Sequence, residues 1–178
     1  MKNAAAKLVL LITILFGCAA LSNAQTICDL SSKSAAFFLD LQTGMSPAQV
    51  QNIVGNAVKI KIKKRGERTF FQNFIKKPAP DSLKGIRALY LRFYDLKLYQ
   101  IEIFYEPRPD LQTLDEIKHA LSVQLKFPFE NWGTKNNSAK IKCGEISLAA
   151  DYVLNPRIEL TDETVLVQIE ALREKDEK

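Results

Sequence analysis

Cationic side chains gather in one short segment, and they are the densest set of groups in the chain that could act on a ligand. Six of the ten residues from 59 to 68 are lysine or arginine. Such a run could form a basic patch for lipid headgroups, an acidic polysaccharide or an acidic protein face. It could also be the solvated side of an edge strand, whose lysines prevent pairing with other sheets, and we favour this interpretation. The six residues are Lys59, Lys61, Lys63, Lys64, Arg65 and Arg68.

Two cysteines have the next clearest chemistry. Of the three in the chain, Cys18 lies in an apolar leader, which leaves Cys28 and Cys143. In an oxidising compartment we expect these two to form a disulfide that closes a loop of more than a hundred residues. The alternative is a reactive thiol served by the single histidine, His119, but nothing in the spacing places it beside a cysteine.

Three aromatic residues, Phe127, Phe129 and Trp132, surround Pro128 after a predicted helix. They could form an exposed recognition loop. Rings in this position more often pack a helix end onto a sheet, and we favour that interpretation. The aromatic residues near the basic segment follow it and do not alternate with its cations, which argues against nucleic-acid binding.

Groups with the spacing of a catalytic or metal site are missing from the sequence. The carboxylates of Asp151, Glu159, Asp162 and Glu163 are scattered over the last predicted strands. One histidine and no close cysteine pair provide no metal-ligand cluster, and no glycine-rich phosphate loop or nucleophile elbow occurs. We therefore expect a protein that is not an enzyme and that holds no metal or cofactor.

The first residues have the pattern of a secretory signal peptide. Lys2 and Lys7 give a positive start, residues 8–16 are apolar but short for a membrane span, and residues 22–24 form a small-residue cleavage site. We expect residues 1–24 to be removed, so that the mature protein begins at Gln25 and is periplasmic or secreted.

A lipid anchor is the alternative for the same segment, because a small residue precedes Cys18 as in lipoprotein signals.

Loss of residues 1–24 would leave 154 residues and a net charge of +3 in place of +5. We expect one domain over residues 25–172, followed by a charged tail at 173–178. The sequence after residue 24 has no apolar stretch long enough to cross a bilayer.

Two helices are predicted from their first residues. Ser46 and Gln49 have the spacing of a capping box, and Gly55 follows the apolar residues of this helix. Thr113 and Glu116 repeat the capping box at the start of a second helix. The apolar faces are Val50, Ile53 and Val54 in the first helix, and Leu114, Ile117, Leu121 and Leu125 in the second.

Alternation of apolar and polar residues predicts strands elsewhere, beginning with residues 58–62. In the next hairpin, a register with Leu91 facing Ile101 and Phe93 facing Tyr99 would leave three residues as the turn. Later in the chain, two alternating sets over 139–152 are out of phase at Gly144, where we expect a bulge. A last hairpin is predicted with strands near 158–160 and 165–169.

These elements predict an α+β fold with two short helices packed on a mostly antiparallel sheet. The order is helix, about three strands, helix, about three strands. Residues 41–106 and 111–171 share this order with little identity, so a weak internal duplication is one explanation and coincidence is the other.

Residues 44–55 (GMSPAQVQNIVG) resemble the helix motif of small exported proteins of the SmpA/OmlA lipoprotein type, which resemble the β-lactamase-inhibitor-protein fold. Residues 89–101 (LYLRFYDLKLYQI) are similar to the hairpin that follows in that group. The resemblance covers about residues 37–105. Asn56 stands where the group usually has proline, and Leu96 stands where it usually has glycine, which indicates a differently shaped turn.

This resemblance implies a non-catalytic envelope protein that scaffolds or inhibits other proteins, and it assigns no functional residue. We expect an exported binding or assembly module whose partner is a protein of the cell envelope. The alternatives are a binder of anionic surfaces through residues 59–68 and an enzyme whose site has no recognisable motif.

Overall fold

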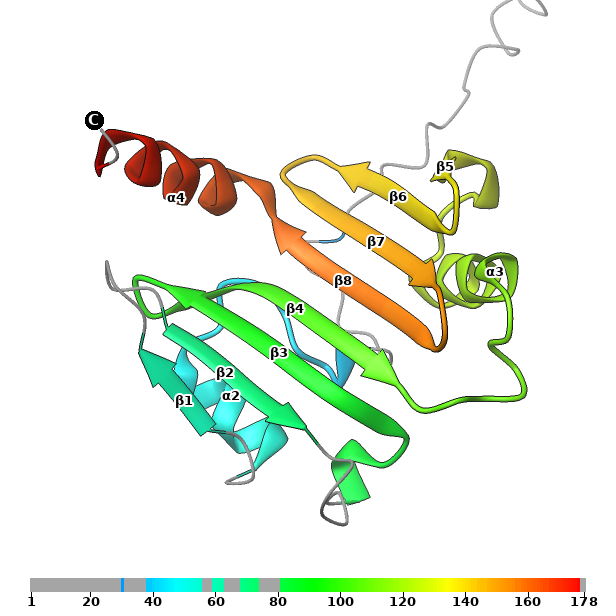
Figure 1. Ribbon diagram of the computed structural model, residues 1–178, viewed down its shortest axis with the longest axis horizontal. Helices are drawn as coiled ribbons and strands as arrows, with labels where there is room; N and C mark the ends of the chain where they lie inside the picture. Colours follow the sequence, from blue (N-terminus) through cyan, green and yellow to red (C-terminus); the bar gives the residue numbers. More distant parts are fainter. Residues whose placement is uncertain (1–29, 31–37, 56–58, 63–67, 74–80, 177–178) are drawn as a thin grey trace, which may run out of the picture.

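The computed structural model of the protein describes residues 30, 38–55, 59–62, 68–73 and 81–176. Within these residues, helices pack on a single eight-stranded sheet in which every neighbouring pair of strands is antiparallel (Figure 1). The predicted α+β class is therefore confirmed.

The elements follow one another as a helix and four strands, a second helix and four strands, and a third helix. In chain order they are α2 (Pro47–Val54), β1 (Lys59–Ile62), β2 (Arg68–Asn73), the 3₁₀ helix η3 (Asp81–Leu83), β3 (Ile86–Tyr94), β4 (Lys97–Tyr105), α3 (Leu114–Leu125), the 3₁₀ helix η4 (Phe129–Asn131), β5 (Gly133–Lys135), β6 (Ser138–Cys143), β7 (Ile146–Tyr152), β8 (Pro156–Asp162) and α4 (Glu163–Asp176).

The two halves of the sheet join where β4 pairs with β8, and the strand order is β1-β2-β3-β4-β8-β7-β6-β5. At this central seam Ile101 lies opposite Leu160 and Ile103 lies opposite Ile158. Each half contains four strands, whereas the sequence predicted about three. In the first half the additional strand is β2, whose apolar pattern is weak. In the second half β5, which has only three residues and no buried side chain, was not predicted, residues 139–152 form two strands, and the predicted strand at 165–169 is part of a helix.

Both predicted helix starts are confirmed. The Ser46 hydroxyl accepts a hydrogen bond from the Gln49 amide at 3.4 Å, while the Ser46 amide donates to the Gln49 side chain at 2.8 Å. Thr113 and Glu116 form the same reciprocal pair at 3.2 and 2.9 Å. Gly55 ends α2 with a φ of +71°, a backbone angle that favours glycine.

The residues before α2 attach that helix to the sheet. The Leu98 amide donates to the Met45 carbonyl at 2.8 Å, and the Gly44 amide donates to the Leu98 carbonyl at 2.7 Å. Gly44 has a φ of +84°, so the turn that brings the chain to β4 requires a left-handed residue.

The β3–β4 hairpin differs from the predicted one at its turn. Leu91 does lie opposite Ile101, but Phe93 lies opposite Leu98, so the expected pairing with Tyr99 is wrong. The turn contains two residues, Asp95 and Leu96, both with positive φ, as a type I′ turn requires. A register shift between Arg92 and Phe93 absorbs the extra residue of β4.

The bulge predicted at Gly144 is also wrong, because Gly144 and Glu145 are the turn between β6 and β7. Cys143 pairs with Ile146 across this turn, and Gly144 has a φ of +61°. The change of phase in the sequence therefore marks two strands that fold back on each other, and not one irregular strand.

The last predicted hairpin is a helix. Asp162 ends β8, and its Oδ1 accepts from the Thr164 amide at 3.0 Å and the Val165 amide at 3.3 Å, which starts α4 in place of a turn. Among the α4 residues whose burial the structure describes, Ile169 alone is buried, while Val167 is 61% exposed. The charged tail expected from residue 173 begins inside this helix.

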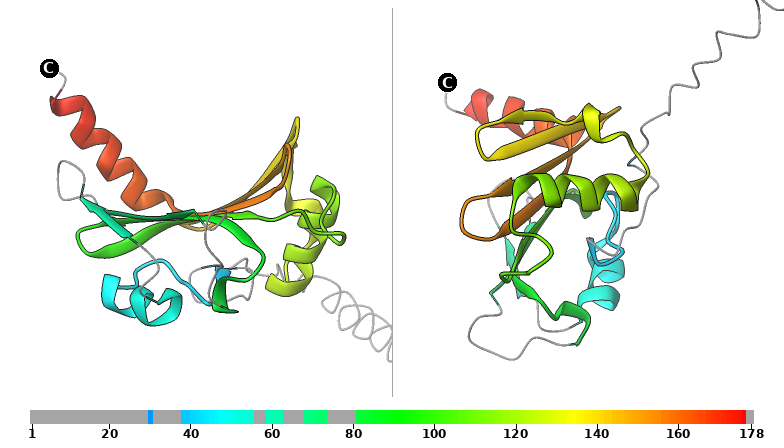
Figure 2. Two further views of the ribbon diagram at one scale, coloured as in Figure 1. Left: turned by 60° about the horizontal axis from the view of Figure 1, so that its bottom comes forward. Right: turned by 90° about the vertical axis from the view of Figure 1, so that its right-hand side faces the viewer.

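The two faces of the sheet differ in what covers them. Helices α2 and α3 lie on one face, and α4 rises from the other, towards which the sheet bends (Figure 2). Side chains from β3, β4, β6, β7 and β8 form the core on the face that carries α2 and α3. We call the opposite side the open face.

Candidate functional site

Polar and aromatic side chains follow the centre of the open face, because strand alternation turns them away from the core. They belong to β3, β4, β7 and β8, so both halves of the sheet contribute. We call this set the open-face cluster. Its members are Tyr90, Arg92, Gln100, Glu102, Phe104, Asp151, Arg157, Glu159 and Thr161.

Arg157 is the centre of the cluster. Its Nε lies 2.6 Å from Glu102 on β4, its Nη1 lies 2.7 Å from Asp151 on β7, and its Nη2 lies 2.7 Å from Glu159 on its own strand. The guanidinium therefore connects three adjacent strands, and its side chain remains 31% exposed.

Gln100 extends this network across the seam. Its Nε2 donates to Glu159 at 2.8 Å and to the Thr161 hydroxyl at 3.1 Å. Its Oε1 accepts from Nη1 of Arg92, whose Nη2 lies 4.0 Å from Glu102. The network thus runs from β3 to β7 and fixes the side chains at the centre of the open face.

Two aromatic rings border the network. The Arg157 guanidinium lies 5.5 Å from the centre of the Phe104 ring, within range of a cation–π contact. The Phe104 and Tyr90 rings meet edge to face, with their centres 5.5 Å apart. Both rings are half-buried, so part of each remains available to a partner.

The charged groups of the cluster shift one another's pKa values. Burial lowers the pKa of Arg157, but the carboxylates of Glu102, Asp151 and Glu159 outweigh burial and hold it above its usual value. Burial raises the pKa of Asp151, and the nearby Arg157 charge only partly opposes this effect. The cluster has two guanidinium and three carboxylate groups, so it is close to neutral as a whole.

Only part of the open-face cluster is accessible to a partner, because Gln100, Glu102 and Thr161 are buried. Its charged groups engage one another, and side chains held in this way lose little conformational freedom when a partner binds. Among the described residues, no group of three or more His, Cys, Asp or Glu side chains is arranged to hold a metal ion.

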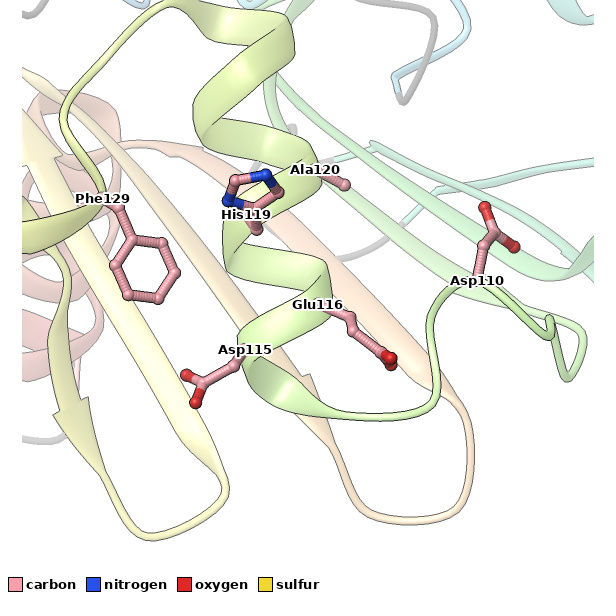
Figure 3. Close-up of a pocket in the computed structure, with 6 residues that line it drawn as sticks. All are labelled: Asp110, Asp115, Glu116, His119, Ala120 and Phe129. Atoms are coloured by element: carbon pink, nitrogen blue, oxygen red, sulfur yellow. The ribbon is translucent and has the colours of Figure 1, made fainter.

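A second feature is an open hollow of about 580 Å³ beside α3 (Figure 3). His119 and Phe129 flank it, with ring centres 6.4 Å apart. Its carboxylates already have structural contacts: Glu116 caps α3, and Asp115 lies 2.9 Å from Nζ of Lys118. The lining residues are Asp110, Asp115, Glu116, His119, Ala120 and Phe129.

The three aromatic residues that were candidates for recognition have different positions. Phe127 and Trp132 are buried in the core, with ring centres 5.5 Å apart, and the indole of Trp132 donates to the Ser122 hydroxyl at 3.0 Å. Phe129 is 39% exposed and lines the hollow beside α3. The three do not form one exposed loop.

The basic segment is only partly described. Lys59 and Lys61 lie in β1, which is an edge strand of the sheet, and Arg68 begins β2. Lys63, Lys64 and Arg65 lie outside the described residues. The interpretation of these lysines as the solvated side of an edge strand stays a prediction.

Cys143 is buried at the end of β6, whereas Cys28 and Cys18 lie outside the described residues. The bond between Cys28 and Cys143 therefore stays a prediction, as does removal of residues 1–24, which also lie outside the described part of the chain. In the part that the structure describes, no helix has the length and apolar character needed to span a membrane.

Sequence reasoning did not identify the open-face cluster. The alternation in β4 and β8 does indicate that Gln100, Glu102, Arg157 and Glu159 point away from the core. It gives no indication that β4 and β8, more than fifty residues apart, are neighbours. The cluster exists only because of that pairing.

Comparisons with known proteins provide no assignment. No family model matches the chain, and neither a curated protein nor a solved structure matches it.

Proposed function

We propose that this protein is an exported, non-catalytic binding module whose open face binds a protein of the cell envelope. The observation that carries the proposal is the open-face cluster, in which paired charges and two aromatic rings lie on the side of the sheet opposite α2 and α3.

Composition and rigidity support this use of the cluster. Arginine, tyrosine and phenylalanine are enriched in protein–protein interfaces, and arginine and tyrosine are frequent among the residues that dominate binding energy. Arg157 is held by three carboxylates, so its orientation is fixed before a partner arrives. A fixed surface avoids part of the entropy cost of association, which favours binding.

Export and the envelope location rest on the sequence. The basic and apolar start, the cleavage site before Gln25 and the resemblance of residues 44–55 to exported lipoproteins of the SmpA/OmlA type support them. A lipid anchor at Cys18 would keep the same partner class and would attach the module to a membrane.

An enzyme is the alternative with the hollow beside α3 as its best candidate site. His119 is there, but Glu116 caps the helix and Asp110 pairs with Arg108 at 2.6 Å. These carboxylates have structural roles, and none is placed as the partner of an activated nucleophile. Binding through the open face therefore accounts for more of the structure.

Quantitative affinity capture from envelope extracts tests the proposal. The bait is the exported protein, and the open-face variant carries Tyr90→Ser and Tyr94→Ser. Tyr94 lies two residues after Arg92 on β3, so strand alternation turns it to the open face as well. The control variant carries Gln124→Ser, an exposed position on α3. We expect a protein that the unmodified bait and the control retain and that the open-face variant loses. Equal recovery by all three baits would contradict binding through this face.

A further inference from the structure

One end of the open face is rich in hydrogen-bond donors. Tyr94 and Lys97 flank the β3–β4 turn and lie opposite each other in the register, and Arg92 lies two residues before Tyr94 on β3. Across the β2–β3 ladder Arg92 lies opposite Thr69, so strand alternation places all four residues on the open face. We call this set the donor corner, and its members are Thr69, Arg92, Tyr94 and Lys97.

The two cations of the donor corner have little opposing charge. Arg92 donates to a neutral amide, that of Gln100, and its one ion pair among the described residues is with Glu102, at 4.0 Å. Lys97 is exposed and forms no ion pair within the described part of the chain. Asp95, in the turn, pairs with neither cation. Both positive charges are therefore available to a partner.

A buried hydroxyl lies beside these cations without a hydrogen bond. Thr69 is 6% exposed, and its Oγ1 is buried with no partner within the part of the chain that the structure describes. Buried polar atoms in folded proteins almost always have a partner, so this hydroxyl calls for an explanation. The Cβ atoms of residues in opposite positions, such as Thr69 and Arg92, lie about 5 Å apart. Small side-chain movements would thus let an acceptor bound at Arg92 also reach the hydroxyl.

Apolar surface adjoins the donor corner. Leu96 in the β3–β4 turn is 49% exposed, and the Tyr94 ring is half-buried. A partner would cover this aliphatic side chain and this ring while its polar groups meet Arg92 and Lys97. Arginine and tyrosine are enriched among the residues that dominate binding energy in protein interfaces, so the surroundings suit a protein partner.

We propose that the envelope protein bound by the open face presents an acidic segment to the donor corner. One carboxylate of this segment binds Arg92 and accepts from Thr69, and a second meets Lys97. An anion is favoured because the corner offers two cations and two hydroxyl groups and no carboxylate of its own. The inference rests on the proposed function and adds the chemistry of the partner.

A protein segment fits this position better than a membrane does. Helix α4 rises from the open face at the same end of the sheet as the β3–β4 turn (Figures 1 and 2). A flat bilayer would meet that helix before it reached the donor corner. A loop or helix of a protein can enter beside α4.

Fluorescence anisotropy with a labelled decaglutamate peptide tests the proposal. At low salt we expect a Kd between about 10 µM and about 1 mM, which rises as salt is added. Arg92→Gln combined with Lys97→Gln should weaken binding at least about tenfold, because both charge-assisted contacts are lost. Lys84→Gln combined with Lys126→Gln is the matched control. It removes the same charge from two exposed lysines outside the open face and should change the Kd less than about twofold.

Two single variants separate the contributions. Lys97→Gln disturbs no ion pair within the described residues, so it should leave the fold intact and weaken binding about threefold. Thr69→Val is nearly isosteric and removes the orphaned hydroxyl. It should raise the melting temperature of the free protein, because an unsatisfied buried oxygen is lost, and it should weaken decaglutamate binding.

No binding of decaglutamate at about 1 mM, or an equal loss in the matched control, would overturn the proposal. Tighter binding to phosphatidylglycerol vesicles than to decaglutamate would overturn it in favour of a lipid surface. A Thr69→Val variant that binds decaglutamate unchanged would contradict the role of the hydroxyl.

Affinity capture from envelope extracts separates this inference from the proposed function. Loss of the envelope protein by the Tyr90→Ser, Tyr94→Ser bait and by the Arg92→Gln, Lys97→Gln bait is the expected result. If the second bait keeps the envelope protein while the first loses it, the open face binds its partner without an acidic segment, and only this inference fails.

Discussion

Arg157 and Glu102 form an ion pair across the seam at which the two halves of the sheet meet, with Nε of the arginine 2.6 Å from Oε1 of the glutamate. One residue belongs to β8 and the other to β4. The pair lies on the open face, directly behind the apolar contacts of Ile103 and Ile158 in the core. The seam is thus stabilised on one side by apolar burial and on the other by charge.

Replacing Arg157 should destabilise the fold. Arg157→Gln leaves Glu102, Asp151 and Glu159 close together without their cation, and we expect a loss of about 2 kcal/mol in the free energy of unfolding, because the site is only partly buried. The loss should shrink below a pH of about 4, where carboxyl groups take up protons. Urea unfolding at neutral and acidic pH measures both effects.

Arg157→Lys is the control for this prediction. It keeps the positive charge but not the three-way geometry, so its loss should be smaller than that of the glutamine variant. Equal stability of all three proteins at neutral pH would show that the network does not stabilise the seam.

The ion pair between Lys140 and Glu163 should make the fold lose stability as the pH falls. A buried acid with a raised pKa has the opposite effect, because it destabilises the fold as the pH rises. Burial raises the pKa of Glu163, but hydrogen bonds from Lys140 and Ser147 and the charges of Lys140 and Lys142 outweigh burial and lower it. A lowered pKa means that the contribution is full above the unfolded-state pKa and disappears as pH falls through the folded-state pKa.

We expect Glu163→Gln to cost about 0.5 kcal/mol at neutral pH, because Lys140 is 57% exposed and solvent weakens the pair. The cost should vanish in acid, where the unmodified glutamate is also neutral. Melting temperatures of both proteins between neutral pH and a pH of about 3 would reveal this convergence. A constant difference across that range would contradict the assigned pKa shift.

Reducing agent should lower the melting temperature if Cys28 and Cys143 form a disulfide. The chain-entropy estimate for so long a loop is about 4–5 kcal/mol, and residual structure in the unfolded chain reduces it. The double variant Cys28→Ser, Cys143→Ser should melt lower than the oxidised protein and should not respond to reductant. Two thiols that react with an alkylating reagent in the native exported protein would rule out the bond.

The lysines of the basic segment should contribute little to binding of anionic surfaces. Replacing Lys59, Lys61 and Lys63 with glutamine should leave binding to phosphatidylglycerol vesicles unchanged at low salt, since β1 is an edge strand, where we expect lysines to prevent strand addition rather than to bind a ligand. A large, salt-dependent decrease would instead favour the function as a binder of anionic surfaces.

Sequence reasoning succeeded where structure is decided locally. The starts of α2 and α3 depend on contacts three residues apart, such as Ser46 with Gln49, and these are visible in the sequence. It failed at Asp95 and Leu96, because the positive φ of a leucine in a two-residue turn has no sequence signal. It also failed for α4, since Val165, Val167 and Ile169 alternate like a strand, and the capping by Asp162 was overlooked.

The candidate site could not be predicted for a different reason. Strand alternation identifies the residues that face away from the core, but the neighbours of β4 and β8 depend on long-range pairing. Only the folded sheet brings Arg157 beside Glu102 and Asp151. The hollow beside α3 likewise combines residues from the loop after β4, α3 and η4.

Photo-cross-linking in the producing cells tests the central claim most directly. A photoreactive amino acid is placed singly at Arg92 or Tyr94 on the open face, and at Gln124 on α3 as the control. Our account predicts one cross-linked envelope protein, shared by the two open-face positions and missing at the control. Cross-links from Gln124 alone, or none from either open-face position, would contradict binding through the open face.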